Sequence, residues 1–369
     1  MVGYKIQRMN DGIVPKKLLF LIFLFLTITG SGCRLSYLFH AGAGQLRILH
    51  SAIPIEKALK DDTLDQEQRN HLNLIEKIKA FGEAELGLVK TKSYETCFLN
   101  SEENRIYTIS ASPKDRLRFI TWWFPIVGKV PYLGYFDLER AISQKRALLD
   151  KDLDVHISVA EAYSTLGWFK DPVPMSLIRS PTVELVETLL HEMVHETLYI
   201  KSQGEFNEGL AVLIGQIGAI RFFEKEYGPH HSFAVKARQF LEDERLFASF
   251  LSSLIGKLEK LYDSSLSYED KIENRQEIFT QSKAEFRGFK KRLHTDRFTN
   301  FDNAEWDNAY LLVSGLYHRH FPLLETVLRQ KNGSVRELLS FYKRMAGENS
   351  GKDMIARTKA WLNKETGRF

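Results

Sequence analysis

Residues 191–195 have the sequence His-Glu-Met-Val-His and lie inside a broadly apolar segment. In an α-helix, residues four apart share one face, so His191 and His195 can present two imidazole nitrogens to one metal ion. Glu192 then lies beside this pair as a candidate general base. Ser180 and Pro181 are a plausible N-cap and first-turn pair, so the sequence predicts a buried metal-binding helix that starts near residue 181.

A third ligand is predicted thirteen residues after His195. Glu208 lies in the first turn of an apolar helix expected from about 206 to 223, after a turn at 201–204. Two histidines and one glutamate with an open fourth position form the ligand set of catalytic zinc in thermolysin-like enzymes, whereas a carboxylate at a helix N-terminus is also favoured by the helix dipole. Glu205 and the pair at 230–231 remain alternative ligands. Glu187, one turn before His191, is a candidate partner for a ligand imidazole.

Residues 1–32 have the pattern of a secretory signal. Lys16 and Lys17 precede an apolar run from residue 18 to 28, which is too short to span a bilayer comfortably and is followed by small residues and Cys33. This arrangement resembles a bacterial lipoprotein signal with cleavage before a lipidated Cys33, although Gly30 stands where an aliphatic residue is usual. An uncleaved N-terminal anchor is the alternative. Either way, the body of the protein is expected outside the cytoplasm.

Charge and cysteine content give no support for a nucleic-acid-binding protein or for a catalytic cysteine. Four basic residues and one acidic residue give residues 1–32 a net charge of +3, which leaves +1 of the total +4 for the rest of the chain. A nearly neutral body gives no argument for nucleic-acid binding. Cys97 is the only other cysteine and has apolar neighbours, so we expect a buried, inert thiol.

The pattern of the whole chain predicts an α+β fold that is predominantly α-helical, with a small β-sheet and a long charged helical hairpin over 251–293. Strand-like segments concentrate between Arg105 and Phe169, interrupted by a helix over 138–149. We expect one unit after the signal. Its predicted parts are 33–104 (N-terminal helices), 105–180 (small sheet), 181–250 (metal-binding helices) and 251–369 (C-terminal helices).

The sequence resembles the predicted aminopeptidase family of bacterial envelope lipoproteins, which is placed among the zincins by its H-E-x-x-H and a following N-E motif. The resemblance rests on residues 37–46, 124–137, 162–172, 191–195, 206–208 and 308–309. It implies a zincin-like metallopeptidase core and adds Asn207 as a residue that supports the ligands. The chain departs from thermolysin-like enzymes at Val212, where they carry an acid. It also lacks the Gly-x-Met-Glu-Asn signature that holds a free α-amine.

A strand over 162–168 precedes the metal helix, as the substrate-aligning edge strand does in zincins, so it is predicted to bind a peptide by strand addition; an internal core strand is equally compatible with the sequence. An oxyanion donor is also expected. Tyr317 is the candidate, and Tyr163, Tyr310 and His318 remain open. The predicted substrate-binding residues are Tyr163, Ser164, Thr165, Leu166 and Gly167.

These observations predict a zinc-dependent peptidase, possessing one Zn²⁺ per chain, that acts on peptides or proteins and is tethered at the periplasmic side of the envelope. Zinc would activate a water, and Glu192 would accept its proton and return it to the leaving amine. Arg34 after Cys33 mildly favours the outer membrane. The alternative is a non-catalytic envelope lipoprotein that uses a zincin fold as a structural or interaction module.

Overall fold

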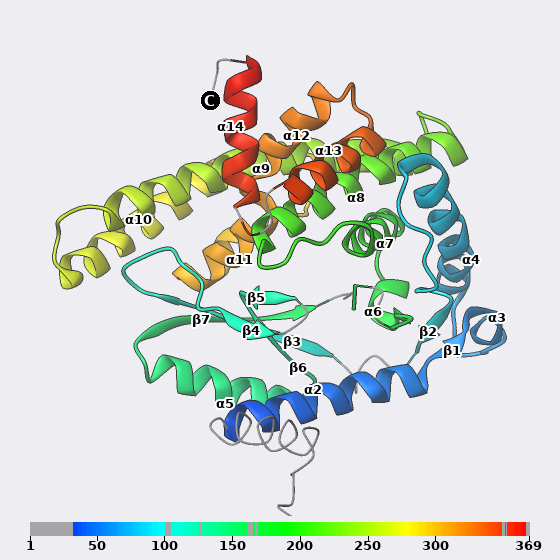
Figure 1. Cartoon of the computed structure of the whole chain (residues 1–369), viewed down its shortest axis with the longest axis horizontal. Helices are drawn as coiled ribbons and strands as arrows, with labels where there is room; N and C mark the ends of the chain where they lie inside the picture. Colours follow the sequence, from blue (N-terminus) through cyan, green and yellow to red (C-terminus); the bar gives the residue numbers. More distant parts are fainter. Residues whose placement is uncertain are drawn as a thin grey trace, which may run out of the picture. The chain divides into compact units, whose positions relative to one another are not determined.

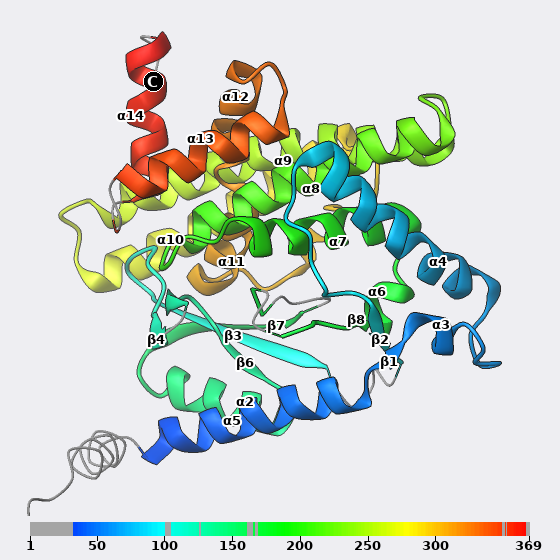
Figure 2. The same cartoon turned by 45° about the vertical axis from the view of Figure 1, so that its right-hand side comes forward.

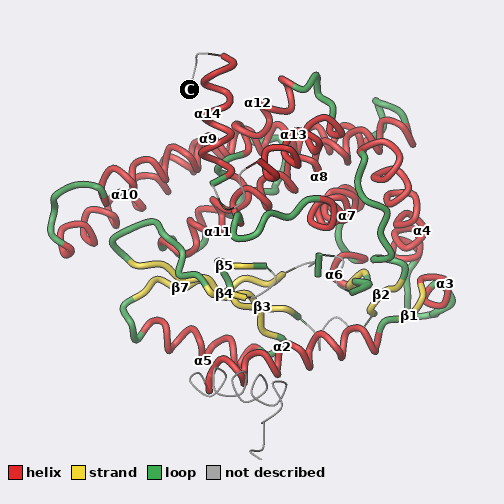
Figure 3. Tube along the Cα trace, viewed as in Figure 1, coloured by secondary structure: helices red, strands yellow, loops and turns green. Residues whose placement is uncertain are grey.

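The computed structural model describes residues 32–99, 105–124, 127–160, 165–166, 169–348, 351 and 353–366. It has two compact units, residues 1–46 and 47–369, and the second contains the sheets and nearly all helices. The α+β, mostly helical class is confirmed (Figure 3). Of the predicted signal over residues 1–32, residues 1–31 lie outside the described residues, and Cys33 falls in the first turn of helix α2, Gly32–Ser51. No helix in the described part of the chain is both long and apolar enough to cross a bilayer.

The largest sheet is antiparallel and has the strand order β6-β3-β7. Its strands are β3 (Ile106–Pro113), β6 (Leu133–Tyr135) and β7 (Leu153–Ala160), with Ser110 of β3 opposite His156 of β7. Helix α5 (Leu138–Leu149) packs against one face, and helix α11 (Asn308–His318) contacts the same two long strands (Figure 1). The predicted helix over 138–149 is confirmed.

Two smaller sheets and the N-terminal helices flank this sheet. Strands β1 (Ile53–Pro54), β2 (Thr96–Phe98) and β8 (Val173–Pro174) form one, and β4 (Trp122–Phe124) pairs with β5 (Gly128–Val130) in the other. Cys97 of β2 is fully buried, which confirms the predicted burial, and burial raises the pKa of its thiol to about 11, which disfavours the reactive thiolate. Helices α3 (Ile55–Ala58), α4 (Gln66–Phe81) and α6 (Met175–Ile178) and the short π-helix η1 (Gly82–Leu86) complete this region.

The main core surrounds helices α7 (Thr182–Thr197) and α8 (Gly204–Tyr227), which the views in Figures 1 and 2 show side by side. Helices α12 (Phe321–Gln330), α13 (Val335–Glu348) and α14 (Met354–Thr366) add apolar side chains to it. The α7 N-cap is Pro181 and not Ser180 as predicted. The Ser180 hydroxyl instead donates a hydrogen bond to the Leu177 carbonyl at 2.7 Å.

Helices α9 (Ser232–Tyr262) and α10 (Tyr268–Phe289) form a helical hairpin. Its first arm starts well before the predicted residue 251, because an apolar face runs along all of α9. The 3₁₀ turns η3 (Lys290–Arg292) and η4 (Phe301–Asn303) lead back toward α11. A second core of aromatic side chains, in which the rings of Phe247 and Phe298 stack with centroids 4.1 Å apart, joins the hairpin to this return segment. The hairpin is therefore packed on one side along its length.

Candidate metal centre

A short connection turns the chain from α7 into α8. After α7 ends at Thr197, the backbone becomes extended at Leu198 and turns at Ser202, whose φ is +63°. The Asn207 side chain holds the loop: its Oδ1 accepts the Ile200 N–H at 2.9 Å, and its Nδ2 donates to the Ile200 carbonyl at 2.8 Å. Asn207 thus supports the site through the loop that precedes Glu208.

A glycine lets the two helices approach closely where the ligands lie. Gly215 follows Glu208 by seven residues, which is two helical turns, so both lie on the face of α8 that meets α7. A Cβ added at Gly215 would lie 2.8 Å from the Glu187 carbonyl oxygen and 3.4 Å from Cβ of His191. A larger residue there would push α8, and with it Glu208, away from the histidines.

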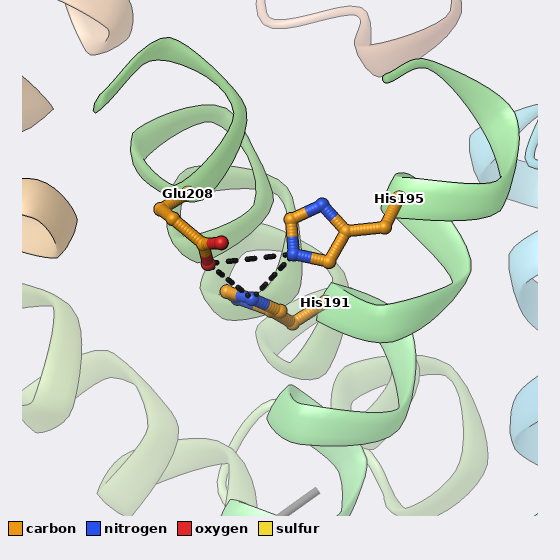
Figure 4. A group of neighbouring side chains, drawn as sticks. All are labelled: His191, His195 and Glu208. Carbon is orange, nitrogen blue, oxygen red and sulfur yellow. Dashed lines mark hydrogen bonds and ion pairs between the residues drawn. The ribbon is translucent and has the colours of Figure 1, made fainter. Parts of the chain in front are cut away.

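His191, His195 and Glu208 converge on one point (Figure 4). The Nε2 atoms of the two histidines are 3.1 Å apart, and they lie 3.3 and 3.4 Å from Oε2 of Glu208. A tetrahedral zinc site with ligands at about 2.0–2.1 Å has edges of about 3.3–3.4 Å between ligand atoms. The three atoms therefore match one face of such a tetrahedron, and this donor set fits a zinc ion.

The electrostatics of this cluster are dominated by burial and by the interaction of its members. Burial alone would raise the pKa of Glu208, but the adjacent imidazoles outweigh it and hold that pKa well below its usual value. Burial would lower the pKa of His195, and the Glu208 carboxylate raises it overall. The ligand atoms are thus strongly coupled to one another inside a site that is nearly closed to solvent.

Glu192 and two tyrosines lie next to the three ligands. Glu192 is 7% exposed, and burial raises its pKa although both imidazoles partly offset this. Tyr317 of α11 lies with its ring centroid 6.4 Å from that of His191, and the negative charge of Glu208 raises the pKa of its phenol well above 10. Tyr199 was not predicted, although it follows His195 by four residues. Burial and then the charge of Glu208 raise its pKa to about 12.

A buried polar network lies behind the ligands. Glu187 was expected to support a ligand imidazole, but the structure gives its Oε2 oxygen another partner: Arg297 donates to it at 2.7 Å. Glu244 of α9 is fully buried, pairs with Nδ1 of His318 at 2.7 Å and accepts from Gln216 of α8 at 3.0 Å. These contacts connect α9 to α8 and α11, and they connect α7 to the segment between η3 and η4.

The other candidate ligands have partners of their own. The Glu205 carboxylate accepts a hydrogen bond at 2.9 Å from Nε2 of His320, the N-cap residue of α12. His231 caps α9 by accepting the Phe233 N–H and stacks on Tyr227. Of the alternative oxyanion donors, Tyr310 packs against the rings of Phe301 and His156, and Tyr163 lies outside the described residues. The structure therefore brings Glu208, and not these residues, to the histidine pair.

The comparisons with known proteins agree with a peptidase. The family described as "Putative aminopeptidase" has a model that matches residues 36–360 of the sequence. The chain belongs to this family. No curated protein and no solved structure matches it. Membership of the putative aminopeptidase family indicates a peptidase that acts on peptide substrates.

The predicted substrate-binding strand over 162–168 is described only at residues 165 and 166, and these two residues are not in a strand. Strand β7 ends at Ala160, and Tyr163, Ser164 and Gly167 lie outside the described residues. Thr165 and Leu166 form a turn, with a φ of +57° at Leu166. The reason is local hydrogen bonding: the Thr165 N–H and hydroxyl both donate to the Asp171 carboxylate, at 2.7 and 2.9 Å. The predicted strand is therefore wrong at Thr165 and Leu166.

Proposed function

We propose that this protein is a zinc-dependent, zincin-like peptidase of the bacterial cell envelope. The observation that carries the proposal is the spacing of the three ligand atoms, all within 4.8 Å of one another, next to the buried carboxylate of Glu192. Membership of the putative aminopeptidase family supports the same reaction class. One Zn²⁺ per chain is the proposed cofactor.

The number of ligands favours catalysis over a structural role. Within the described residues, the cluster contains three side chains that can hold a metal and no fourth His, Cys, Asp or Glu. Structural zinc sites are usually closed by four protein ligands, whereas catalytic sites keep one position open. A structural site also has no use for a base, and Glu192 lies in the position of one. The non-catalytic alternative is therefore not favoured.

Each residue has a distinct role in the proposed reaction. A bound zinc ion supplies Lewis-acid polarisation of the scissile carbonyl and lowers the pKa of water in the site. Glu192, on the turn that carries both histidines, accepts the proton of the attacking water and delivers it to the leaving amine. Tyr317 keeps its proton at neutral pH and donates a hydrogen bond to the oxyanion that develops on the substrate. Asn207 and Arg297 hold the surrounding backbone and the Glu187 carboxylate in place.

The proposed location rests on the N-terminal sequence. Residues 1–32 would direct export, and Cys33 would carry lipid or the segment would remain as an anchor; Arg34 favours the outer membrane. Metabolic labelling with a fatty acid tests this: label should enter the wild type and be absent from a Cys33→Ala variant. Equal labelling of both proteins would exclude lipidation at Cys33.

The proposed function is tested most simply with Glu192→Gln. This change keeps the shape of the side chain and the three ligands but removes the base, so the variant should retain its zinc and lose peptide hydrolysis by a factor of about 100 or more. Hydrolysis of a peptide library, analysed by mass spectrometry next to the metal content of each protein, gives both readings. Full activity in Glu192→Gln would refute the proposed base.

A further inference from the structure

A second feature of the structure lies next to the metal helix and has no part in the proposed chemistry. It is a cavity of about 630 Å³, lined by residues 89–93, Leu166, residues 169–170 and Glu196. Glu196 follows His195 directly on α7 and lies one turn after Glu192 on the same helical face. The cavity therefore adjoins the side of the helix from which the proposed base projects.

Positive charge gathers at the rim of this cavity. Lys90, Lys92 and Lys170 line it and are all exposed. None of the three forms an ion pair among the described residues. The same rim carries two exposed apolar side chains, Phe169 at 49% and Val89 at 44% exposure. A rim with three cations and apolar surface fits an anionic group on a partly apolar ligand.

The wall formed by α7 has the opposite character. Among the described residues, no hydrogen-bond partner is found for the buried Oε1 atom of Glu196. Lys79 is close enough for the charge of Glu196 to act on its pKa. Its ammonium group nevertheless donates its hydrogen bond to the Ser93 carbonyl, at 2.6 Å, and not to Glu196. Glu196 lines the cavity, and a lining carboxylate without a donor of its own can accept a hydrogen bond from a bound ligand. An ammonium group is the donor that also offsets its charge.

We propose that the cavity binds the first residue of a peptide that begins with Asp or Glu. The α-ammonium group of the peptide pairs with Glu196, and the acidic side chain of that residue meets Lys90, Lys92 and Lys170. This assignment rests on the proposed peptidase function, because it places the first peptide bond toward Glu192. It supplies an amine-binding group that the sequence patterns of known zinc aminopeptidases do not identify in this chain.

Binding can be measured without turnover in the full chain carrying Glu192→Gln. Titration calorimetry compares three dipeptides: Glu-Ala, Gln-Ala and N-acetyl-Glu-Ala. Glu-Ala should bind about tenfold more tightly than either of the others, because each of them lacks one of the two charges. Equal affinities for Glu-Ala and Gln-Ala would overturn the proposed role of the lysines, and equal affinities for Glu-Ala and its acetylated form would overturn that of Glu196.

Two further variants locate the charges. In the same background, Lys90→Gln, Lys92→Gln and Lys170→Gln together should reduce Glu-Ala affinity to that of Gln-Ala. A matched triple of exposed lysines that do not line the cavity, Lys57→Gln, Lys77→Gln and Lys343→Gln, should leave it unchanged. An equal loss in both triples would mean a diffuse charge effect and would contradict the proposed site.

Activity separates this inference from the proposed function. If the wild type hydrolyses peptides with acidic and neutral first residues at the same kcat/KM, the cavity assignment fails and the peptidase stands. If no peptide is hydrolysed but Glu-Ala binding depends on the three lysines, the cavity assignment stands and the peptidase fails. A preference for acidic first residues that is lost in the cavity triple supports both.

Discussion

Two buried polar clusters in this chain differ in how their groups are satisfied. At the junction of the sheet and the hairpin, Asp154 and Arg275 are each about 6% exposed and pair at 2.7 Å. Asn308 donates its backbone N–H to Asp154 at 3.0 Å and accepts the Tyr262 hydroxyl at 2.8 Å. One positive and one negative charge cancel within this cluster.

The cluster of His191, His195 and Glu208 is arranged differently. Three atoms with lone pairs point at one another at 3.1–3.4 Å, and a second carboxylate, Glu192, lies next to them. A shared proton can bridge two of these atoms, whereas a metal ion binds all three. The difference teaches that the first cluster balances its charges by itself and holds the fold, while the second needs a cation to bind its three ligand atoms.

The largest effect on stability is expected from removing one charge of the Asp154–Arg275 pair. Arg275→Met leaves the Asp154 carboxylate buried without its cation, which should lower the free energy of unfolding by about 3–5 kcal/mol. Urea unfolding measures this loss, and the zinc content should not change. The double variant Asp154→Leu, Arg275→Met is the control and should recover much of the loss. If Arg275→Met were as stable as the wild type, the pair would not hold the sheet to the hairpin.

A smaller effect on stability is expected when zinc binds to His191, His195 and Glu208. Zinc at about 100 times its dissociation constant should raise the free energy of unfolding by about 3 kcal/mol, because it binds the folded state. Thermal unfolding with added zinc or with a chelator measures this shift. Glu208→Ala should remove the response and Arg275→Met should keep it. The same zinc response in Glu208→Ala would show that the ion binds elsewhere.

Asp171 extends the comparison to a buried carboxylate that, in the described part of the chain, has neither a cationic partner nor a metal-ligand neighbour in hydrogen-bond contact. This carboxylate accepts hydrogen bonds only from the neutral Thr165 among the described residues. Burial raises its pKa to about 6 from an ordinary value near 3.8. The folded state therefore binds the proton more tightly than the unfolded state, and the stability gained from it is lost as pH rises from about 4 to about 6. Relative to Asp171→Asn, the wild type should lose about 2 kcal/mol over this interval. Parallel urea curves at pH 4, 5, 6 and 7 for the two proteins would contradict this shift.

The sequence was sufficient to predict those parts of the fold and the site that depend on interactions between residues close in the chain. The spacing of four between the histidines, the short turn to Glu208 and the helix over 138–149 all depend on residues close in the chain. Arg297 could not be predicted as the partner of Glu187, because 110 residues separate them. Glu244 and His318 are likewise brought together only by the packing of α9 on α11.

The errors have equally local causes. The composition around Thr165 favours a strand, but the Asp171 side chain captures the Thr165 backbone N–H and turns the chain. Ser180 is a good N-cap by residue type, yet its hydroxyl bonds to the preceding helix α6 and Pro181 takes the cap position. In both cases a side-chain hydrogen bond replaced the interaction that residue preferences predict.

The metal content of the purified full-length protein tests the central claim most directly. Elemental analysis should find about one zinc per chain in the wild type and almost none in His195→Ala and Glu208→Ala, with Glu205→Ala as a control that keeps its zinc. Glu205 is the right control because its carboxylate contacts His320 and lies on the same helix as Glu208. A wild-type protein without metal after zinc has been supplied, or equal zinc in all four proteins, would contradict the account.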